Sequence, residues 1–354
     1  MHPEVAPSND TQPLKIVDIR EEVPNVKTYF LQTKDITPLP YKAGQFLTFV
    51  FSRHGREERR SYSISSSPAA GEPLAITIKR VENGAHSRWL IDHARIGDEL
   101  MGTAAAGVFT LPGNIEAYPQ LFFFAAGIGI TPILSLIKEL LFSDTPTRIV
   151  LYYSNRSHTA TAFKETLLRL QEQFSDRFKI EWLFSDAKNL LRARISKNNI
   201  RQLLHQYLEV APGELLCYIC GPEDYRWMLN LLLEEAGVPT YNIRKEIFVP
   251  GRMPVPSLPP DTEPHVVTIL RGNEHYELKV QYPETILSAA KKAGIRMPYS
   301  CEAGRCASCI VQCTAGKVWM AYNEVLTEND LRHGLTLTCT GYPIGGDATL
   351  TIPS

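Results

Sequence analysis

Four cysteines near the C-terminus have the spacing of a metal-cluster site. Cys301, Cys306 and Cys309 form a C-x4-C-x2-C run, and Cys339 lies further along the chain. Plant-type [2Fe-2S] clusters are held by thiolates with this spacing. A structural zinc site normally uses two closely spaced cysteine pairs, whereas these four cysteines contain only one, Cys306 with Cys309. The spacing therefore favours a [2Fe-2S] cluster over a zinc ion or four ordinary buried cysteines.

The residues between these cysteines suit a tight loop around a cluster. Gly304 can turn without a Cβ clash, and Ala307 and Ser308 are small enough for backbone N–H groups to approach cluster sulfurs. Such hydrogen bonds tune the reduction potential. Cys313 adds a fifth sulfur nearby, but the alternation of the expected strand predicts that it is buried and is not a ligand.

The segment from about residue 265 to the end resembles a plant-type ferredoxin domain, because it carries these four cysteines. The stretch 316–326, which includes Gly316, Trp319 and Asn323, is similar to ferredoxin domains that are fused to flavin reductases. The resemblance implies a β-grasp fold of the α+β class. It also implies that a flavin upstream supplies electrons one at a time.

The run Arg60-Ser61-Tyr62-Ser63 resembles the flavin-binding RxYS motif of the ferredoxin-NADP reductase superfamily. Taken alone, the four residues could equally form an exposed strand with alternating polar side chains. The resemblance implies that Tyr62 stacks on the isoalloxazine ring, Arg60 holds a cofactor phosphate, and Ser63 offers its hydroxyl near flavin N5.

A second segment of the same superfamily follows this motif. The stretch after Lys79 and the turn Gly84-Ala-His86-Ser87 resemble the region where a glycine turn leads into a short helix whose N-terminus receives flavin phosphates. The resemblance places Lys79, Gly84, His86 and Ser87 in the flavin site. It favours FAD, although some relatives with this domain order use FMN.

The run Gly127-Ile-Gly129-Ile-Thr131-Pro132 follows an apolar stretch, 121–126, that is typical of a strand in a buried parallel sheet. Its glycines can bring backbone N–H groups against a pyrophosphate. Thr131 can cap the next helix, and Pro132 suits the first helical turn. The third glycine of the usual dinucleotide fingerprint is missing. The GxGxTP pattern nevertheless resembles the pyridine-nucleotide domain of the same superfamily.

The next expected strand, 148–153, ends at Ser154 without the acidic residue that commonly binds the ribose hydroxyls of NADH. Ser154 and Arg156 could instead bind a 2′-phosphate, which favours NADPH. A surface arginine after a strand is common, so NADH stays open as the alternative. Arg194 resembles a second nucleotide-contacting arginine of the superfamily.

The run Cys220-Gly221-Pro222 ends another apolar stretch and resembles the CGP motif that lies beneath the nicotinamide in this superfamily. Cys217 and Cys220 also form a CxxC pair. Because redox dithiols normally lie at a helix N-terminus, we expect Cys217 in the core and Cys220 beside the nicotinamide.

Glu246 and Phe248 resemble the terminal ExF of the nucleotide domain in this superfamily. The resemblance implies an aromatic ring at the flavin face and an acid near the reactive edge. The alternative is a strand end with one buried ring. By resemblance, Ser63, Cys220 and Glu246 are the residues expected nearest to hydride transfer.

The overall composition limits the possible functions. The chain has 354 residues, a formal net charge of −1 and seven cysteines. It is too long for a single core, and its charge gives no reason to expect binding to nucleic acid or to an anionic membrane surface. Its cysteines fit a metal site in a reducing compartment, which predicts a cytoplasmic protein. The apolar run 121–137 is interrupted by glycines and a proline, so it does not predict membrane insertion.

Changes of pattern along the chain predict four segments. Short alternating runs predict an antiparallel β-barrel, the flavin domain, at 14–113. Alternating strands and helices predict an α/β, Rossmann-like NAD(P)H domain at 114–250. A proline-rich linker is expected at 251–264, and the [2Fe-2S] ferredoxin domain at 265–354.

Together, these resemblances cover the chain from about residue 14 onward, which is similar to the reductase components of multicomponent oxygenases. They imply that NAD(P)H reduces a flavin, the flavin reduces the cluster, and the cluster reduces a separate oxygenase component. The similarity is greatest to the reductase subunits of ring 1,2-phenylacetyl-CoA epoxidases, which implies a di-iron oxygenase and phenylacetate catabolism. Three alternatives remain: a reductase of Rieske-type or steroid hydroxylases, a stand-alone NAD(P)H reductase of another acceptor, and a redox sensor with a vestigial nucleotide fold.

Overall fold

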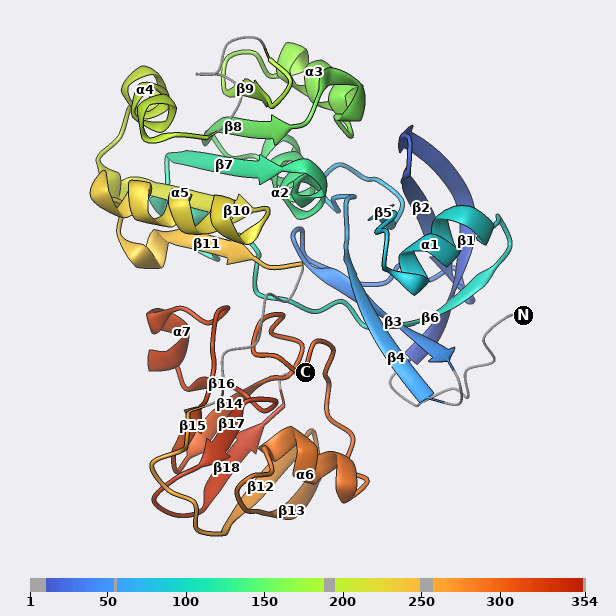
Figure 1. Cartoon of the computed structure of the whole chain (residues 1–354), viewed down its shortest axis with the longest axis vertical. Coiled ribbons are helices and arrows are strands. Elements are labelled where there is room, and N and C mark those ends of the chain that lie inside the picture. The colour runs from blue at the N-terminus through green and yellow to red at the C-terminus, as the bar shows by residue number, and fades with distance from the viewer. Residues whose placement is uncertain (1–10, 54–55, 188–194, 249–256, 353–354) are drawn as a thin grey trace. The chain divides into compact units, whose positions relative to one another are not determined.

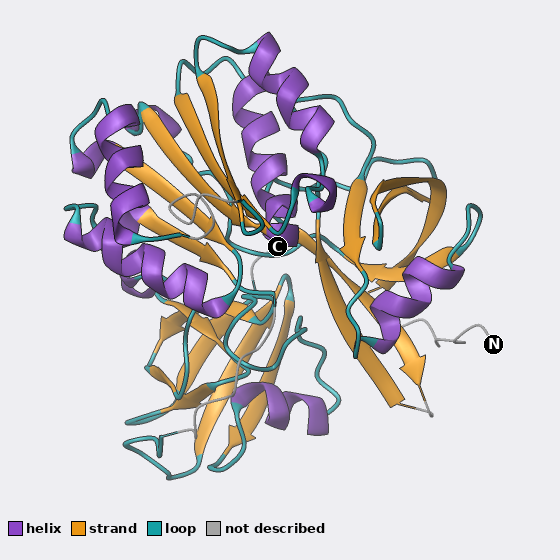
Figure 2. Cartoon of the chain, turned by 45° about the horizontal axis from the view of Figure 1, so that its top comes forward, coloured by secondary structure: helices purple, strands orange, loops and turns teal. Residues whose placement is uncertain are grey.

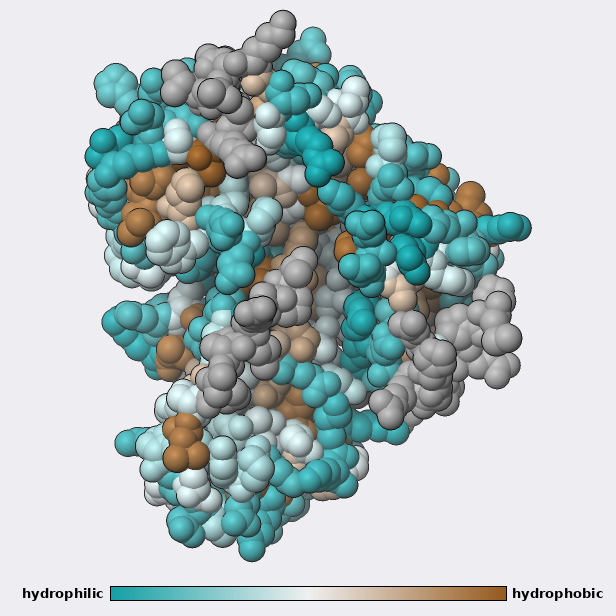
Figure 3. All heavy atoms as spheres, viewed as in Figure 1, coloured by the Kyte–Doolittle hydropathy of each residue, from teal (hydrophilic) through white to brown (hydrophobic). Residues whose placement is uncertain are grey.

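The computed structural model describes residues 11–53, 56–187, 195–248 and 257–352. The chain divides into two compact units, Met1–Phe248 and Val249–Ser354. The first unit contains an antiparallel sheet and a parallel sheet with its helices, and the second contains a smaller sheet (Figures 1 and 2). Hydrophilic side chains predominate on the face seen in Figure 3. Within the described ranges, every helix is too short or too polar to cross a membrane.

The N-terminal part of the first unit is an antiparallel barrel with one short helix. Its elements are β1 (Thr11–Val23), β2 (Val26–Thr33), β3 (Phe46–Arg53), β4 (Arg56–Ser63), β5 (Ala75–Lys79), α1 (Ala85–His93) and β6 (Glu99–Thr103). The strand order is β4-β3-β6-β1-β2-β5, and the two edge strands meet where Ile64 pairs with Ile76. Helix α1 covers one end, where the Tyr29 hydroxyl donates to the Leu90 carbonyl at 2.8 Å. The expected antiparallel barrel is confirmed.

Two details of this barrel differ from the sequence expectation. Strand β6 pairs with β1 and β3, although its short sequence Glu-Leu-Met-Gly-Thr lacks a clear alternating pattern. Strand β1 begins before Leu14, because Thr11 already pairs with Thr103 of β6.

The rest of the first unit is a parallel sheet with helices on both faces. Its elements are η1 (Ile115–Ala117), β7 (Gln120–Ala126), η2 (Gly127–Gly129), α2 (Ile130–Phe142), β8 (Arg148–Asn155), η3 (His158–Ala160), α3 (Lys164–Gln173), β9 (Phe178–Phe184), α4 (Lys197–Tyr207), η5 (Pro212–Glu214), β10 (Leu215–Cys220), α5 (Glu223–Glu235), η6 (Thr240–Asn242) and β11 (Ile243–Glu246). Phe123 of β7 packs in the core with α2 and α3, and its neighbour Phe122 packs with α4 and α5. Strand residues buried on both faces explain the continuously apolar sequence of β7.

The strand order of this sheet is β11-β10-β7-β8-β9, and all four pairings are parallel. The chain runs outward from β7 to β9 and then returns to place β10 on the other side of β7. The crevice between the carboxyl ends of β7 and β10 is therefore the topological switch point, where α/β sheets of this kind bind ligands. The expected Rossmann-like arrangement is confirmed.

The barrel and the parallel sheet share a core. Phe109, which follows β6, packs edge-on against Tyr218 of β10 with ring centroids 5.1 Å apart. Tyr218 also stacks on Phe123, and its hydroxyl donates to the Thr110 carbonyl at 2.8 Å. These contacts hold the barrel against the sheet within one unit.

The second unit has the β-grasp fold of the α+β class, as expected. Its elements are β12 (His265–Arg271), β13 (Glu274–Val280), α6 (Ile286–Lys292), β14 (Ile310–Ala315), β15 (Val318–Met320), α7 (Glu328–Arg332), β16 (Leu335–Leu337), β17 (Gly341–Pro343) and β18 (Ala348–Thr351). The main sheet has the order β13-β12-β18-β14-β16, with β12 and β18 parallel. Ile286 and Leu287 of α6 are fully buried in its core. The loop with three of the four cysteines connects α6 to β14.

Gly129 lies where the turns after β7 and β10 meet. A Cβ atom at this position would lie 2.2 Å from the Cys220 carbonyl oxygen and 2.6 Å from its carbonyl carbon. Both are backbone atoms within a packed sheet, so they cannot move aside cheaply. A glycine is required here because of this close approach.

We expect Gly129→Ala to destabilise the first unit by about 1–3 kcal/mol, because the methyl group overpacks the junction between β7 and β10. The measurement is the free energy of unfolding in urea. Gly213→Ala is the matched control, because an added Cβ at Gly213 meets no atom within 4 Å. Equal stability of the two variants would contradict the prediction.

Candidate functional site

The RxYS residues form the last four positions of β4, and their side chains alternate between its two faces. Arg60 and Tyr62 share one face because side chains alternate along a strand. The Arg60 side chain is 51% exposed, whereas Tyr62 is half-buried with its ring centroid 6.1 Å from that of Phe49. Ser63 lies on the other face and is buried. Burial raises the pKa of Tyr62, so its phenol stays neutral. A flat ring beside an accessible guanidinium fits a flavin with its phosphate.

The turn before α1 has the geometry of an anion site. Gly84 is the N-cap residue, and no side chain in the described ranges caps this first turn. The Ser87 hydroxyl donates to the Gly84 carbonyl and accepts from the Val81 N–H, both at 3.1 Å, so it fastens the turn. A Cβ at Gly84 would lie 2.5 Å from that hydroxyl oxygen. Lys79 ends β5 with an exposed side chain. The first-turn N–H groups of α1 can therefore bind an anion.

Glu58 is a residue of this region that sequence reasoning missed. Its Oε2 lies 2.7 Å from His86 Nε2 and accepts from Arg60 Nη2 at 3.1 Å. The His86 ring stacks on Phe51 with centroids 4.3 Å apart. Glu58 thus joins the β4 motif to α1. The available signal was its position two residues before Arg60, which puts both side chains on one strand face.

The glycine turn after β7 lies at the switch point of the parallel sheet. Gly127 has φ +52°, and an added Cβ there would meet nothing within 4 Å, so a ligand can approach the backbone. Gly129 is the N-cap of α2, and Thr131 lies inside the first turn, where its hydroxyl donates to the Ile128 carbonyl at 3.0 Å. The expectation that Thr131 caps this helix is therefore wrong, because the chain already coils at η2. Pro132 lies in the first turn, as expected.

The two turns at the switch point differ in charge. The first turn of α2 has no acidic residue, whereas the first turn of α5 carries Glu223 and Asp224. Acidic side chains at a helix N-terminus repel an anion. The turn at Gly127 therefore suits a pyrophosphate, and the turn at Gly221 suits an uncharged ligand group.

The CGP turn is tightly held, with its cysteine buried and its proline exposed. Cys220 is 1% exposed, and Pro222 is the exposed N-cap of α5. A Cβ at Gly221 would lie 2.9 Å from the Ala126 Cβ, which is why only glycine fits. The buried Arg226 donates to the Gly221 carbonyl at 2.7 Å, a contact that no sequence pattern indicated.

Cys220 and Glu246 are directly opposite each other on β10 and β11, and both are buried. Burial and the nearby Glu246 carboxylate raise the pKa of the Cys220 thiol. Burial also raises the pKa of Cys217, which lies in the core. Both cysteines therefore stay protonated near neutral pH, as expected for packing residues. Phe248, two residues after Glu246, is 39% exposed.

The end of β8 contains the residues expected to select the nucleotide. The Ser154 hydroxyl is buried and within hydrogen-bonding contact of the Tyr225 hydroxyl on α5. Arg156 is exposed, and its carbonyl accepts from the Asp186 N–H at 3.1 Å. Asp186 follows β9, so an acidic residue reaches this edge from the neighbouring strand. Asp186 was not predicted as a nucleotide-binding residue, because it follows β9 and lies thirty residues after Arg156 in the sequence. Arg194 lies outside the described residues.

The four cysteines of the second unit form two pairs. The thiols of Cys301 and Cys306 are within hydrogen-bonding contact, and so are those of Cys309 and Cys339. In the described part of the chain, no three His, Cys, Asp or Glu side chains converge on the position of a single metal ion. Because each iron of a [2Fe-2S] cluster has two protein ligands, this two-by-two donor set fits the cluster better than a zinc ion.

Backbone N–H groups of the loop point at its sulfurs. The Cys306 thiol and the N–H groups of Arg305, Ala303 and Cys306 lower the pKa of Cys301 to about 6. Hydrogen bonding from Cys339 lowers the pKa of Cys309. Each pair thus holds one thiol with a lowered pKa, whereas the hydrogen bond between the two sulfurs and burial raise the pKa of its partner, Cys306 or Cys339.

The loop reaches this shape through unusual backbone angles. Gly304 has φ +68°, and a Cβ there would lie 2.6 Å from the Tyr322 carbonyl oxygen, so the sequence expectation for Gly304 is confirmed. Ala307 and Glu302 are also left-handed, with φ +56° and +51°. The buried Arg305 donates to the Tyr322 hydroxyl at 2.9 Å and pairs with Glu324 at 3.2 Å. These contacts fasten the loop to the segment after β15.

Cys313 lies on β14 and is half-buried rather than fully buried. It lies four residues after Cys309, the last cysteine of the loop, and its thiol donates to the Ala315 carbonyl at 3.3 Å. The two cysteine pairs involve only the other four cysteines of this unit. Its expected role as a non-ligand remains a prediction.

Three protein-family models match the chain. The oxidoreductase FAD-binding domain matches residues 13–110, the oxidoreductase NAD-binding domain matches 123–228, and the 2Fe-2S iron-sulfur cluster binding domain matches 271–343. Each matched region contains one of the sites described above. The chain therefore has FAD, NAD and [2Fe-2S] domains in that order.

Similar proteins share this organisation over most of their length. The ferredoxin reductase component of 3-ketosteroid-9-alpha-monooxygenase from Mycobacterium tuberculosis is 30% identical, covering 96% of this chain and 95% of that protein. A subunit of 1,2-phenylacetyl-CoA epoxidase from Escherichia coli is also 30% identical, covering 88% of each chain. The solved structure of phthalate dioxygenase reductase covers 97% of this chain and 98% of its own, with a TM-score of 0.59 and 24% identity, and shares the fold. The chain belongs to the ferredoxin-NADP reductase superfamily, as an oxygenase reductase component with a C-terminal plant-type [2Fe-2S] domain.

Proposed function

We propose that this oxidoreductase transfers electrons from NAD(P)H through FAD and a [2Fe-2S] cluster to a separate oxygenase component. The two-by-two arrangement of the four cysteines carries the proposal. A [2Fe-2S] cluster takes one electron at a time, whereas a nicotinamide gives up two as a hydride. A carrier that handles both must stand between them, and the N-terminal barrel has the residues to hold one.

The residues named above divide the work of binding and orientation. A flavin held in the barrel would supply the capacity to accept a hydride and to release electrons one at a time. Tyr62 covers the flavin ring, and Arg60 with the N-terminus of α1 binds its phosphate groups. For these contacts Arg60 exchanges part of its pairing with Glu58 for a phosphate. Ser63 provides a hydroxyl at the reactive edge.

The nucleotide binds at the switch point in this proposal. The Gly127 turn holds its pyrophosphate against the N-terminus of α2, and Cys220 with Gly221 and Pro222 supports its nicotinamide. Glu246 lies directly beside Cys220 and faces the same crevice edge. Phe248, two residues after Glu246, would lie at the flavin face. The protonated Cys220 presents a neutral surface that does not react with the ring.

For the acceptor, we favour a di-iron oxygenase of the phenylacetyl-CoA epoxidase type, in a cytoplasmic pathway of phenylacetate catabolism. The likeness to the Escherichia coli protein of that epoxidase supports this choice. The reductase component of the steroid monooxygenase has the same sequence identity to this chain, 30%, so a steroid monooxygenase is the second candidate.

Anaerobic reduction of the purified protein tests the electron path. We expect NADPH or NADH to bleach the flavin absorbance first and then to produce the electron paramagnetic resonance signal of a reduced [2Fe-2S] cluster. A bleached flavin with a silent cluster would contradict electron transfer between them. No bleaching by either nucleotide would favour a redox sensor. Reoxidation by a small acceptor, but by neither candidate oxygenase, would favour a stand-alone reductase.

Replacing one cluster cysteine should separate the two halves of the path. We expect Cys306→Ser to lose the cluster, because an alcohol is a poor iron ligand, while flavin reduction by NAD(P)H keeps its rate. Iron content and visible absorbance measure the first effect, and stopped-flow absorbance measures the second. Cys313→Ser is the matched control and should keep its iron. Loss of iron from Cys313→Ser would contradict the ligand assignment.

Nucleotide choice should depend on Arg156. If Arg156 binds a 2′-phosphate, Arg156→Ala loses a charged hydrogen bond of about 1.5–3 kcal/mol, which raises the Kd for NADPH roughly 10- to 100-fold and leaves that for NADH unchanged. Asp186→Asn is the counterpart and should weaken NADH selectively if the acid binds the ribose hydroxyls. Equal effects of Arg156→Ala on both nucleotides would contradict a role in selection.

A further inference from the structure

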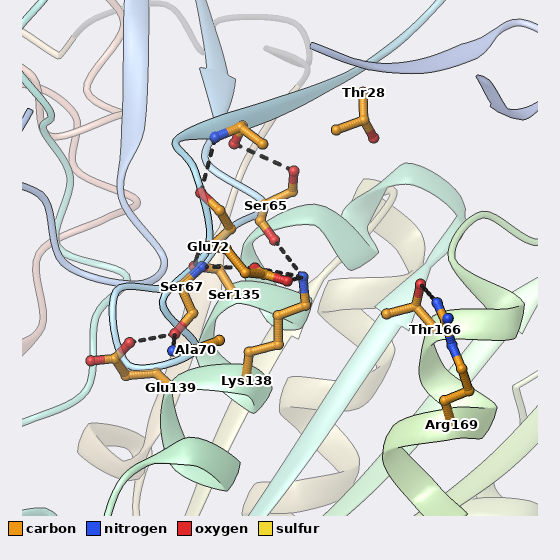
Figure 4. Close-up of polar contacts among 12 residues, drawn as sticks. Thr28, Ser65, Ser67, Ala70, Glu72, Ser135, Lys138, Glu139, Thr166 and Arg169 are labelled. Carbon is orange, nitrogen blue, oxygen red and sulfur yellow. Dashed lines mark hydrogen bonds and ion pairs between the residues drawn. The ribbon is translucent and has the colours of Figure 1, made fainter. Parts of the chain in front are cut away.

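Helix α2 carries a polar cluster that faces the barrel, although most of the helix is apolar. Ser135 and Lys138 are 0% and 7% exposed, and Glu139 follows one residue later. Residues three and four apart share one face of a helix, so these three side chains point in the same direction. They meet the segment 65–72, which begins two residues after the flavin motif ends at Ser63. Figure 4 shows this cluster.

Lys138 uses all of its hydrogen-bonding capacity in this cluster. Its ammonium group donates to both carboxylate oxygens of Glu72, at 2.7 and 2.8 Å, and to the Ser65 carbonyl at 3.4 Å (Figure 4). An ammonium group has three donors, so these three acceptors fix its orientation. Burial lowers the pKa of Lys138, and the Glu72 carboxylate opposes that effect.

Two further side chains of α2 fasten the same segment. The Ser135 hydroxyl donates to the Ser66 carbonyl at 2.5 Å. The Glu139 carboxylate accepts from the Ser67 hydroxyl at 2.6 Å and from the Ala69 N–H at 3.2 Å. The segment 65–69 is therefore held to α2 at four of its five residues, 65, 66, 67 and 69.

The barrel side of the contact is equally well anchored. The Ser65 N–H donates to the Ala75 carbonyl at 2.8 Å, in the region where the barrel closes. The Ser65 hydroxyl lies 2.8 Å from that of Thr77, which in turn lies 2.8 Å from that of Thr28. A displacement of α2 relative to this segment would break several buried hydrogen bonds together.

A pair such as Lys138 and Glu72 adds little net stability, because the cost of burying the charges offsets their attraction. Its distinctive property is geometric, since it permits one relative position of α2 and the barrel. Lys138 is nine residues after Gly129, or about 13 Å along the helix axis. Helix α2 thus has the Gly127–Gly129 turn, proposed to bind the nucleotide, at its N-terminus. The segment 65–72, which follows the flavin motif, is hydrogen-bonded along the side of the helix.

We propose that Lys138 is a positioning residue which, with Glu72, Ser135 and Glu139, sets the distance between the bound nicotinamide and the flavin. This inference rests on the proposed function. Hydride transfer requires reacting atoms about 3–3.5 Å apart, and a misplacement of about 1 Å can reduce the rate roughly a hundredfold. None of these four residues is among those proposed to bind the flavin or the nucleotide. Replacing one of them should therefore change the rate of hydride transfer rather than the affinity for either cofactor.

The test is Lys138→Met, which keeps the length of the side chain, fills the buried site and leaves Glu72, whose side chain is 33% exposed, able to take up water. Anaerobic stopped-flow reduction of the flavin by saturating nucleotide gives the transfer rate, and its dependence on nucleotide concentration gives the Kd. We expect the rate to fall about 10- to 100-fold while the Kd and the bound flavin stay unchanged. Lys138→Arg should recover part of the rate.

Lys197→Met is the matched control, because Lys197 also pairs with a carboxylate, Glu235, but on the outer helices α4 and α5. It should keep the full transfer rate. Ser135→Ala removes the contacts of this hydroxyl with the Ser66 carbonyl and the Gly44 N–H without altering charge. It should also slow the transfer, which keeps the proposal testable if Lys138→Met folds poorly. An unchanged rate in Lys138→Met, or a fall matched by lost flavin or by Lys197→Met, would overturn the proposal. Failure of the unaltered protein to reduce its flavin would instead overturn the proposed function.

Discussion

The first unit depends on the close approach of two backbone turns. The Cys220 carbonyl lies so near Gly129 that no side chain fits between them. This contact brings the turn after β7 against the turn after β10 at the switch point. A turn that suits a pyrophosphate and a turn that suits an uncharged ring are therefore held at one separation. The parallel register of β7, β10 and β11 then brings Glu246 to the same edge.

In the second unit, three of the four cluster cysteines lie on an irregular loop between α6 and β14, so the backbone of this loop must place their sulfur atoms. Left-handed residues at Glu302, Gly304 and Ala307 turn the backbone so that its N–H groups point at sulfur. The buried Arg305 fastens the loop from behind. The second unit uses backbone N–H groups to hydrogen-bond its cysteine sulfurs, and in the proposed function the first unit would use such groups for cofactor phosphates. This shared device explains why small residues recur in the functional loops.

The sequence predicted the parts of this molecule whose signal is local. The four cysteines, Gly304 and the apolar strand before Gly127 are readable because each depends on spacing or on residue size. The prediction for Thr131 was wrong because a threonine before an apolar helix is typical of a cap. The short 3-10 helix η2 makes α2 begin earlier, with Gly129 as its N-cap. The contact of Arg226 with the Gly221 carbonyl follows no sequence pattern. The alternation along β4 indicates the pairing of Glu58 with Arg60, but the contacts of Glu58 with His86 and of Asp186 with Arg156 join elements that are distant in the sequence. The cluster around Lys138 is of the same kind, since its partners lie more than sixty residues away.

Non-glycine residues in the left-handed region cost about 1 kcal/mol or more each, and the loop between α6 and β14 contains two of them. Bonds from sulfur to iron would compensate for that conformation, so the folded loop and the metal stabilise each other. Without the metal that compensation would be absent, so we expect the loop between α6 and β14 to be less stable than in the metal-bound protein, while the first unit keeps its own core.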